Sequence, residues 1–197
     1  MPKKLDLSNV VASTGDFEAI PEGAYVLEVT EVRDDVSKEY IELVFDIAEG
    51  PHKGAYGDAW AKEHPYAHRA VMSYKETAAG LLKNWLDVLT ESNPGFDAEA
   101  AYYGACDNPA LLGMFVGRRF GMSMLWDWWT EKDGVREPLK NPRPDWMHAR
   151  VCSVQSVMDG SAKPPKRRER NTPPEGGAAP SSPAAVPSRD TYEDIPF

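Results

Sequence analysis

Residues 39–50, EYIELVFDIAEG, carry the pattern that most constrains the fold of this chain. Apolar side chains alternate with mostly polar ones, so that Ile41, Leu43, Phe45 and Ile47 share one side, and Tyr40, Glu42, Val44 and Asp46 share the other. A period of two residues fits a β-strand and not a helix. The segment is therefore predicted to be a half-buried strand, with one face on a core and the other toward solvent.

Similar patterns predict further strands and a helix. The expected strands are residues 23–33, 39–50, 56–60, 117–134 and 145–157, with turns at 34–38 and at Asp133-Gly134. Leucine and tryptophan recur every three or four residues over 78–89, which predicts an amphipathic helix that ends before Pro94, and short helical turns are expected over 97–113. Five strands with a helix between the third and fourth are typical of the oligonucleotide-binding (OB) fold. We therefore expect a mainly β fold with an inserted helix, a five-stranded OB-type barrel, although other small α+β folds share this order.

The composition changes near Met158. Eight of the 17 prolines lie beyond it, and large apolar residues are nearly absent until Tyr192. Such a segment cannot bury enough surface to offset the entropy of ordering, so it is predicted to be disordered. We expect an N-terminal arm at 1–19, an OB-fold domain at 20–158, a disordered linker at 159–189 and an acidic tip at 190–197. The linker contains a basic cluster, KPPKRRER, at 163–170.

The net charge of −9 lies in the first part of the chain, because residues 158–197 hold six basic and six acidic side chains. An acidic domain argues against a protein that coats nucleic acid by bulk charge alone. It leaves room for a local basic groove.

The chain ends EDIPF, and a disordered tail gains nothing by exposing Phe197 to water. Phe197 can fill an apolar pocket, and its α-carboxylate can meet an arginine or lysine of a partner. Pro196 limits the conformational freedom lost on binding, and the nearby acids can speed encounter with a basic rim. The tip is therefore predicted to be a partner-docking peptide made by Asp194, Ile195, Pro196 and Phe197.

The ending Asp-Ile-Pro-Phe resembles the acidic C-terminal tip of bacterial single-stranded-DNA-binding proteins, which also follows a β-rich domain and a Pro/Gly/Ser-rich linker. The stretches IPEGAYVLEVTEV, YIELVFDIAEGPHKGAY and LLGMFVGRRFGMSM are similar to those of a phage-encoded group of such proteins. The tip departs from the family by having few acids, and Tyr192 interrupts them. The resemblance implies a phage or prophage OB-fold protein that binds and protects single-stranded DNA without sequence preference during replication, recombination or repair. It also implies that proteins of these processes dock on the tip.

Binding a single strand requires flat side chains on which bases stack and positive charge along the phosphates. Alternation over 117–134 places Phe120, Met122, Met124, Trp126 and Trp128 on one face, which favours a core role, and Trp129 on the other. The stacking candidates are Trp129, Trp60, Tyr40 and Tyr56, with Trp126 and Trp128 as alternatives if the faces are reversed. The phosphate candidates are Arg118, Arg119, Lys53, Lys62, Arg69, Lys75 and Arg33. The basic cluster could grip DNA, pair with the acidic tip, or only keep the linker soluble.

Other chemistries find little support. His64 and His68 are four residues apart, but no third ligand follows, so no metal or cofactor is expected. No nucleophile motif or phosphate-binding glycine loop indicates an enzyme. Two cysteines without a CxxC motif, no apolar run of a membrane span's length and no signal peptide predict a protein of the bacterial host cytoplasm, away from membranes. Self-association into a homo-oligomer is compatible with the sequence.

Two alternatives remain. An adaptor, or decoy, could use the same tip to occupy the tail-binding pockets of host repair proteins without binding DNA, and it predicts no oligonucleotide binding. A phage recombination nuclease predicts DNA loss in Mg²⁺, but it lacks an evident metal cluster.

Overall fold

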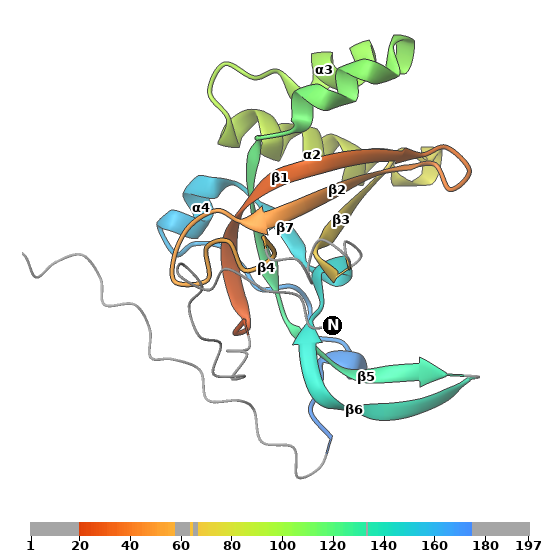
Figure 1. The fold of residues 1–197 in the computed structure, drawn as a ribbon, viewed down its shortest axis with the longest axis vertical. Helices are drawn as coiled ribbons and strands as arrows, with labels where there is room; N and C mark the ends of the chain where they lie inside the picture. The colour runs from red at the N-terminus through yellow and green to blue at the C-terminus, as the bar shows by residue number, and fades with distance from the viewer. Residues whose placement is uncertain (1–19, 58–63, 65–66, 133, 175–197) are drawn as a thin grey trace, which may run out of the picture.

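The computed structural model describes residues 20–57, 64, 67–132 and 134–174, and its fold is β-rich with inserted helices (Figure 1). A five-stranded antiparallel sheet runs in the order β3-β2-β1-β4-β7. Its strands are β1 (Gly23–Asp35), β2 (Tyr40–Ile47), β3 (Arg69–Ser73), β4 (Arg119–Met124) and β7 (Arg150–Cys152). A second sheet pairs β5 (Trp126–Lys132) with β6 (Val135–Pro144). The predicted mainly β fold of five strands, with helix inserted between the third and fourth, is confirmed.

Helices connect β3 to β4 and surround β7. The first group is η2 (Glu76–Ala78), α2 (Ala79–Ser92), α3 (Ala98–Asp107) and η3 (Pro109–Phe115), and the second is η4 (Trp146–His148), α4 (Val154–Met158) and η5 (Glu169–Asn171). Figure 1 shows α2 and α3 at one end of the molecule and the β5–β6 hairpin at the other. Within the described ranges, none of the helices has the length and apolar character needed to cross a bilayer.

The alternating segment forms β2, and its apolar side faces the core as predicted. Leu43 and Phe45 are fully buried, and β2 pairs antiparallel with β1 on one side and β3 on the other. The opposite face is more covered than a half-buried strand would be, because Glu42 and Val44 are also buried. A strand in the middle of the sheet is overlaid by side chains of both neighbours, which its own sequence does not reveal.

Two strands lie elsewhere than the sequence pattern indicated. The third strand is β3, and Tyr56, which was expected to open it, lies in a turn, while residues 58–60 are outside the described residues. The strand expected over 145–157 is divided into η4, β7 and α4, and the Ser153 hydroxyl caps α4 by accepting from the Ser156 N–H at 3.3 Å. Strands of five and three residues hold too few alternations to be separated from neighbouring turns.

The long strand predicted over 117–134 is broken at Leu125 into β4 and β5. Hydrogen bonds from residues outside the sheet stabilise the chain where β4 ends and β5 begins. Glu22 Oε1 accepts from the Trp126 backbone N–H at 2.9 Å, and the Ile20 carbonyl accepts from the Trp126 indole N–H at 2.8 Å. β5 therefore leaves the main sheet and pairs with β6 beyond Gly134, whose φ of 75° suits the turn predicted there, whereas Asp133 lies outside the described residues.

The main sheet curls into a half-barrel, and within the described residues its edge strands β3 and β7 do not pair with each other. Trp146 of η4 is buried, and η4 lies against β3. Its ring is edge-on to Phe45, with centroids 5.2 Å apart, and its indole N–H donates to Tyr56 Oη at 2.8 Å. Trp146 thus packs in the interior of the half-barrel, against aromatic rings of β1 and β2.

The folded region extends past the domain boundary expected at Met158. Residues 159–174 are described, and Asn171 is buried. The prediction of disorder does not hold for this stretch, because Arg170 and Asn171 meet buried partners on the β5–β6 hairpin. Local composition could not reveal those partners. The remainder of the expected linker, the tip at 190–197 and the arm at 1–19 lie outside the described residues.

Candidate nucleic-acid interface

The outward side of β1, β2 and β3 carries charged side chains around one buried carboxylate. Glu42 on β2 pairs with Arg69 on β3, and Arg33 on β1 places its Nη1 3.9 Å from Glu42 Oε2. Arg33 also donates to both carboxylate oxygens of Glu31, at 2.7 and 2.8 Å, and these hydrogen bonds lower the pKa of Glu31. Two predicted phosphate contacts, Arg33 and Arg69, are thus brought together, but two carboxylates balance their charge.

The predicted pair Arg118 and Arg119 is divided between two environments. Arg119 Nε donates to Glu28 at 2.9 Å, and its Nη1 donates to Glu49 at 3.0 Å. Arg118 Nε donates to the Met114 carbonyl at 3.1 Å, and its guanidinium lies 4.2 Å from the centroid of the Phe96 ring. Arg119 therefore sits among acids on the sheet, whereas Arg118 stacks on the loop that follows α2.

The three predicted lysines have different outcomes. Lys53 is exposed in the turns after β2, and Lys75 is exposed at the start of η2. Lys62 lies outside the described residues. An exposed lysine holds a mobile point charge, so Lys53 and Lys75 can reach a phosphate.

Three of the six aromatic candidates pack into the protein interior. Trp126 and Trp128 are 4% and 5% exposed and lie edge-on to each other, which agrees with the core role favoured by the alternation. Tyr56 stacks on buried His68 with ring centroids 4.7 Å apart, and burial raises the pKa of Tyr56. A base cannot reach the rings of Trp126 and Trp128 as they are placed, whereas Tyr56 is only partly buried. Trp60 lies outside the described residues.

Tyr40, Tyr56 and Trp129 are the described candidates whose rings are only partly buried, and of these Tyr40 and Trp129 each lie on a hairpin. Tyr40 opens β2 beside the β1–β2 turn, where Lys38 Nζ donates to its hydroxyl at 3.2 Å and lies 5.6 Å from its ring centroid. Trp129 is on β5, with the Arg136 guanidinium of β6 5.4 Å from its ring centroid. Each ring is therefore paired with a cation from its own hairpin.

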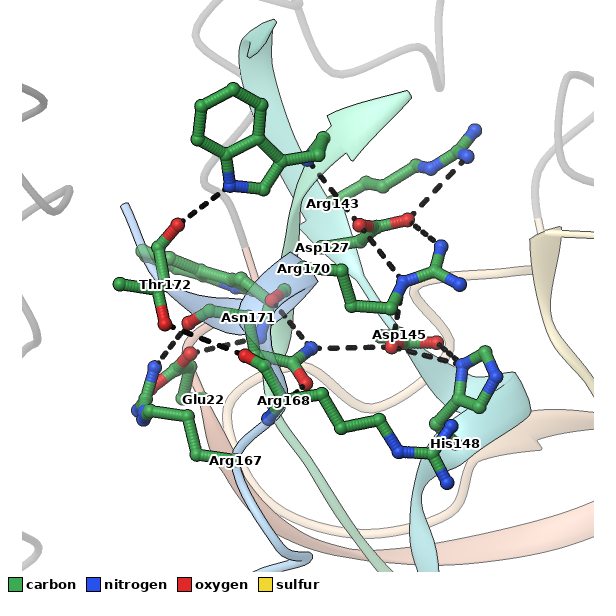
Figure 2. Close-up of polar contacts among 12 residues, drawn as sticks. Glu22, Asp127, Arg143, Asp145, His148, Arg167, Arg168, Arg170, Asn171 and Thr172 are labelled. Atoms are coloured by element: carbon green, nitrogen blue, oxygen red, sulfur yellow. Dashed lines mark hydrogen bonds and ion pairs between the residues drawn. The ribbon is translucent and has the colours of Figure 1, made fainter. Parts of the chain in front are cut away.

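A buried ion network holds the base of the β5–β6 hairpin (Figure 2). Asp127 and Asp145 are 3% and 5% exposed, and Arg170 reaches both, with its Nε 3.2 Å from Asp127 Oδ1 and 3.6 Å from Asp145 Oδ2. Arg143 lies 3.7 Å from Asp127, and His148 Nδ1 lies 2.8 Å from Asp145. Hydrogen bonding to Asp127 raises the pKa of the Arg170 guanidinium. Removing one partner of such a buried pair destabilises a protein by about 3–5 kcal/mol.

Sequence reasoning missed this network. Asp127 stands inside a run of tryptophans, and Arg170 belongs to a cluster that reads as solvated linker. Their separation of 43 residues leaves no local periodic signal. The residues that could have indicated it are the two acids next to aromatic side chains, because an acid in an apolar setting needs a cation.

Of the two histidines that are four residues apart, His68 lies in the packed interior. His68 is buried, and its Nδ1 lies 2.7 Å from the Phe45 carbonyl oxygen, so its imidazole belongs to the packed interior. Within residues 20–57, 64, 67–132 and 134–174, no three histidine, cysteine or acidic side chains are grouped closely enough to hold a metal ion.

Comparison with known proteins does not assign a family: no family model matches the chain, and no curated protein matches it.

Proposed function

We propose that this protein binds single-stranded DNA without sequence preference and recruits replication, recombination or repair proteins through its C-terminal tip. The fold supports the first part. A half-barrel of order β3-β2-β1-β4-β7, with its helices between the third and fourth strands, is the strand order of an OB fold. OB domains bind oligonucleotides on the face of their second and third strands and on the loops between strands one and two and between strands four and five.

The observation that carries the proposal is the position of the two half-exposed aromatic rings. Tyr40 borders the connection between the first two strands, and Trp129 stands on the β5–β6 hairpin, which fills the connection between the fourth and fifth strands of the half-barrel. Both rings therefore lie on elements that an OB fold uses to bind oligonucleotides. Stacking on each would contribute about 1–3 kcal/mol per base.

The charges near these rings favour moderate, salt-sensitive binding. Arg33, Arg69 and Arg119 are already paired with carboxylates, so each must exchange a carboxylate for a phosphate to contribute. Lys53 and Lys75 are exposed. Binding therefore depends on stacking more than on bulk charge, in keeping with the net charge of −9.

The direct test is a titration of the full chain with labelled oligo-dT at low and high salt, followed by anisotropy and tryptophan fluorescence. We expect binding that weakens with salt and quenches tryptophan emission. A duplex of the same length is the control, because a stacking site requires unpaired bases. Equal affinity for the duplex would contradict the proposal.

A second candidate is an adaptor that occupies the tail-binding pockets of host repair proteins without binding DNA. The pairing of three candidate arginines with acids favours it. It predicts no oligo-dT binding at micromolar protein, together with partner binding that requires the tip. The same titration therefore separates the two candidates.

A further inference from the structure

We infer that residues 167–172, here called the latch, fix the β5–β6 hairpin on the half-barrel and thereby position Trp129 for single-stranded DNA. The latch includes η5 and lies against the base of the hairpin (Figure 2). The part of this inference that concerns DNA rests on the proposed function. The part that concerns the hairpin is independent of it.

Arg170 joins the two ends of the hairpin. Asp127 is the second residue of β5, and Asp145 directly follows the last residue of β6. The Arg170 guanidinium contacts both carboxylates, and both are almost completely buried. A single planar cation thus ties together the points at which the chain enters and leaves the hairpin.

Asn171, which is uncharged, also links the two ends of the hairpin. Its Nδ2 donates to the Trp126 carbonyl at 2.9 Å and to Asp145 Oδ2 at 3.2 Å, again one partner at each end of the hairpin. Asn171 is 3% exposed. Since these donors and acceptors are shielded from water, leaving any of them without a partner is unfavourable, and the latch is held in one place.

The latch also orients the half-exposed ring on the hairpin. The Thr172 carbonyl accepts from the Trp129 indole N–H at 2.8 Å. Glu169 pairs with Arg136 at 2.8 Å, and Arg136 lies over the Trp129 ring. Two residues of the latch therefore hold Trp129. Thr172 accepts a hydrogen bond from the edge of the indole ring, and Glu169 holds Arg136, whose guanidinium lies over the face of the ring.

The other end of the latch is tied to the start of β1. Arg167 Nη2 donates to Glu22 Oε2 at 2.9 Å, while Glu22 Oε1 accepts from the Trp126 backbone N–H at 2.9 Å. Glu22 lies at the entry to β1, in the main sheet. The hairpin and the half-barrel are thus joined through the latch as well as through the chain at Leu125.

These contacts divide the basic cluster 163–170 into two parts. Arg167 and Arg170 are engaged with Glu22, Asp127 and Asp145, whereas Lys163, Lys166 and Arg168 are exposed. For Arg170 to bind a phosphate it would have to leave two buried carboxylates, whose other neighbours are Arg143 at 3.7 Å and His148 at 2.8 Å, and this costs more than an exposed phosphate contact returns. We therefore assign Arg170 to positioning, and the exposed Lys163, Lys166 and Arg168 to any phosphate contact made by the cluster.

The test uses hydrogen exchange of the full chain without DNA. Arg170→Met and Asn171→Ala each break the latch, and Lys166→Met is the control that removes one exposed cation. We expect amides of β5 and β6 to exchange roughly tenfold to a hundredfold faster in both latch variants, with β1 and β2 unchanged. The control should match the wild type. Asn171→Ala removes no charge, so it tests the role of the latch even if Arg170→Met fails to fold. If the exchange of the hairpin amides is unchanged in Asn171→Ala, the latch does not fix the hairpin.

Two further readouts separate positioning from mere stability. The Trp129 indole N–H resonance, assigned with Trp129→Phe, should move toward that of a water-exposed indole in both latch variants. Oligo-dT affinity should fall in these variants with an unchanged dependence on salt. A salt slope that falls by about 0.7 in Arg170→Met would instead mean that Arg170 contacts a phosphate, against our assignment. If the wild type binds no oligo-dT, the proposed function fails, while the exchange data still decide whether the latch holds the hairpin.

Discussion

Glu42 and Arg69 form an ion pair across β2 and β3, and the carboxylate of this pair is nearly inaccessible to water. Under the proposed function, the β1–β2–β3 face that carries this pair corresponds to the face where OB domains bind oligonucleotides, and Glu42 would oppose any phosphate that approaches Arg69 or Arg33. We predict that Glu42→Gln tightens oligo-dT binding roughly threefold to tenfold, because it removes one negative charge from this face. Anisotropy titrations at several salt concentrations measure the change.

Glu99→Gln is the matched control for Glu42→Gln, because Glu99 is an exposed carboxylate on α3, at the opposite end of the molecule from the β5–β6 hairpin. Thermal melts of both variants check that the fold persists. If the two substitutions raise affinity equally, only the net charge matters and the β1–β2–β3 face is not the binding surface.

Adjacent tryptophans on β5 should respond differently to truncation. Trp129→Ala is predicted to weaken oligo-dT binding by about 1–3 kcal/mol, because it removes a half-exposed stacking ring. Trp128→Ala is predicted to lower the free energy of unfolding by about 3–5 kcal/mol, because Trp128 is buried. Parallel binding and urea-unfolding measurements test both, and wild-type affinity in Trp129→Ala would remove Trp129 from the site.

Gly121 lies where α4 presses on β4. A Cβ at this position would meet Val157 Cγ2 at 2.6 Å and the Ser153 carbonyl oxygen at 2.7 Å. Gly121→Ala should therefore displace α4 and destabilise the protein by about 1–3 kcal/mol. Gly80→Ala is the control, because nothing lies within 4 Å of a Cβ there and alanine favours α2 by about 0.5–1 kcal/mol. Urea unfolding should show opposite signs for the two variants, and equal signs would refute the close contact.

Tyr25 makes stability sensitive to alkaline pH. Its hydroxyl donates to the Pro21 carbonyl at 2.7 Å, and burial raises its pKa from 10.0 to about 12. The unfolded chain ionises first, so the stabilisation present below pH 10 is lost as the pH rises from 10 toward 12. Tyr25→Phe should reduce this loss by about 1–2 kcal/mol, after allowance for partial exposure. Unfolding at several alkaline pH values measures it, with Tyr103→Phe at an exposed tyrosine as the control.

Deletion of Phe197 should separate the two proposed activities. We predict roughly unchanged oligo-dT affinity together with loss of partner docking, because the terminal ring and carboxylate are the proposed docking groups. Titration of the full and shortened chains, and binding of each to a host repair protein that recognises such tips, provide the measurement. A large loss of DNA affinity on this deletion would mean that the tip also takes part in binding the strand.

The sequence predicted those parts of the fold that depend on local alternation. The apolar sides of β2 and β4 are buried as expected. Successive side chains of a strand point to opposite faces of the sheet, so the alternation in the sequence directly indicates which side chains face the core. The helical stripe over 78–89 forms α2, with Trp85 and Leu86 buried, although Leu81 of the same stripe is exposed. The spacing of apolar residues identifies which side of a helix faces the core, but it does not show how far along the helix the core extends.

The candidate site was less predictable, because it depends on partners distant in sequence. Alternation separated Trp129 from Trp128, but nothing local indicated that Arg33, Arg69 and Arg119 would be paired with acids. The sheet places β1 beside both β2 and β4, and only this pairing brings Glu28 to Arg119. The sequence shows that a charged side chain is present. Whether that side chain is free of an ion pair, and so available to bind a phosphate, depends on the tertiary structure.

The latch also has a consequence for synthesis of the chain on the ribosome. Asp127 and Asp145 leave the ribosome before Arg170, which follows Asp127 by 43 residues. At elongation rates of roughly 5–20 residues per second, the 25 residues from Asp145 to Arg170 correspond to about 1–5 seconds, during which the hairpin carries two acids without their common cation. The strands of the half-barrel, complete at Cys152, can associate in that interval. The hairpin can therefore acquire its final position last, after the strands that it adjoins are in place.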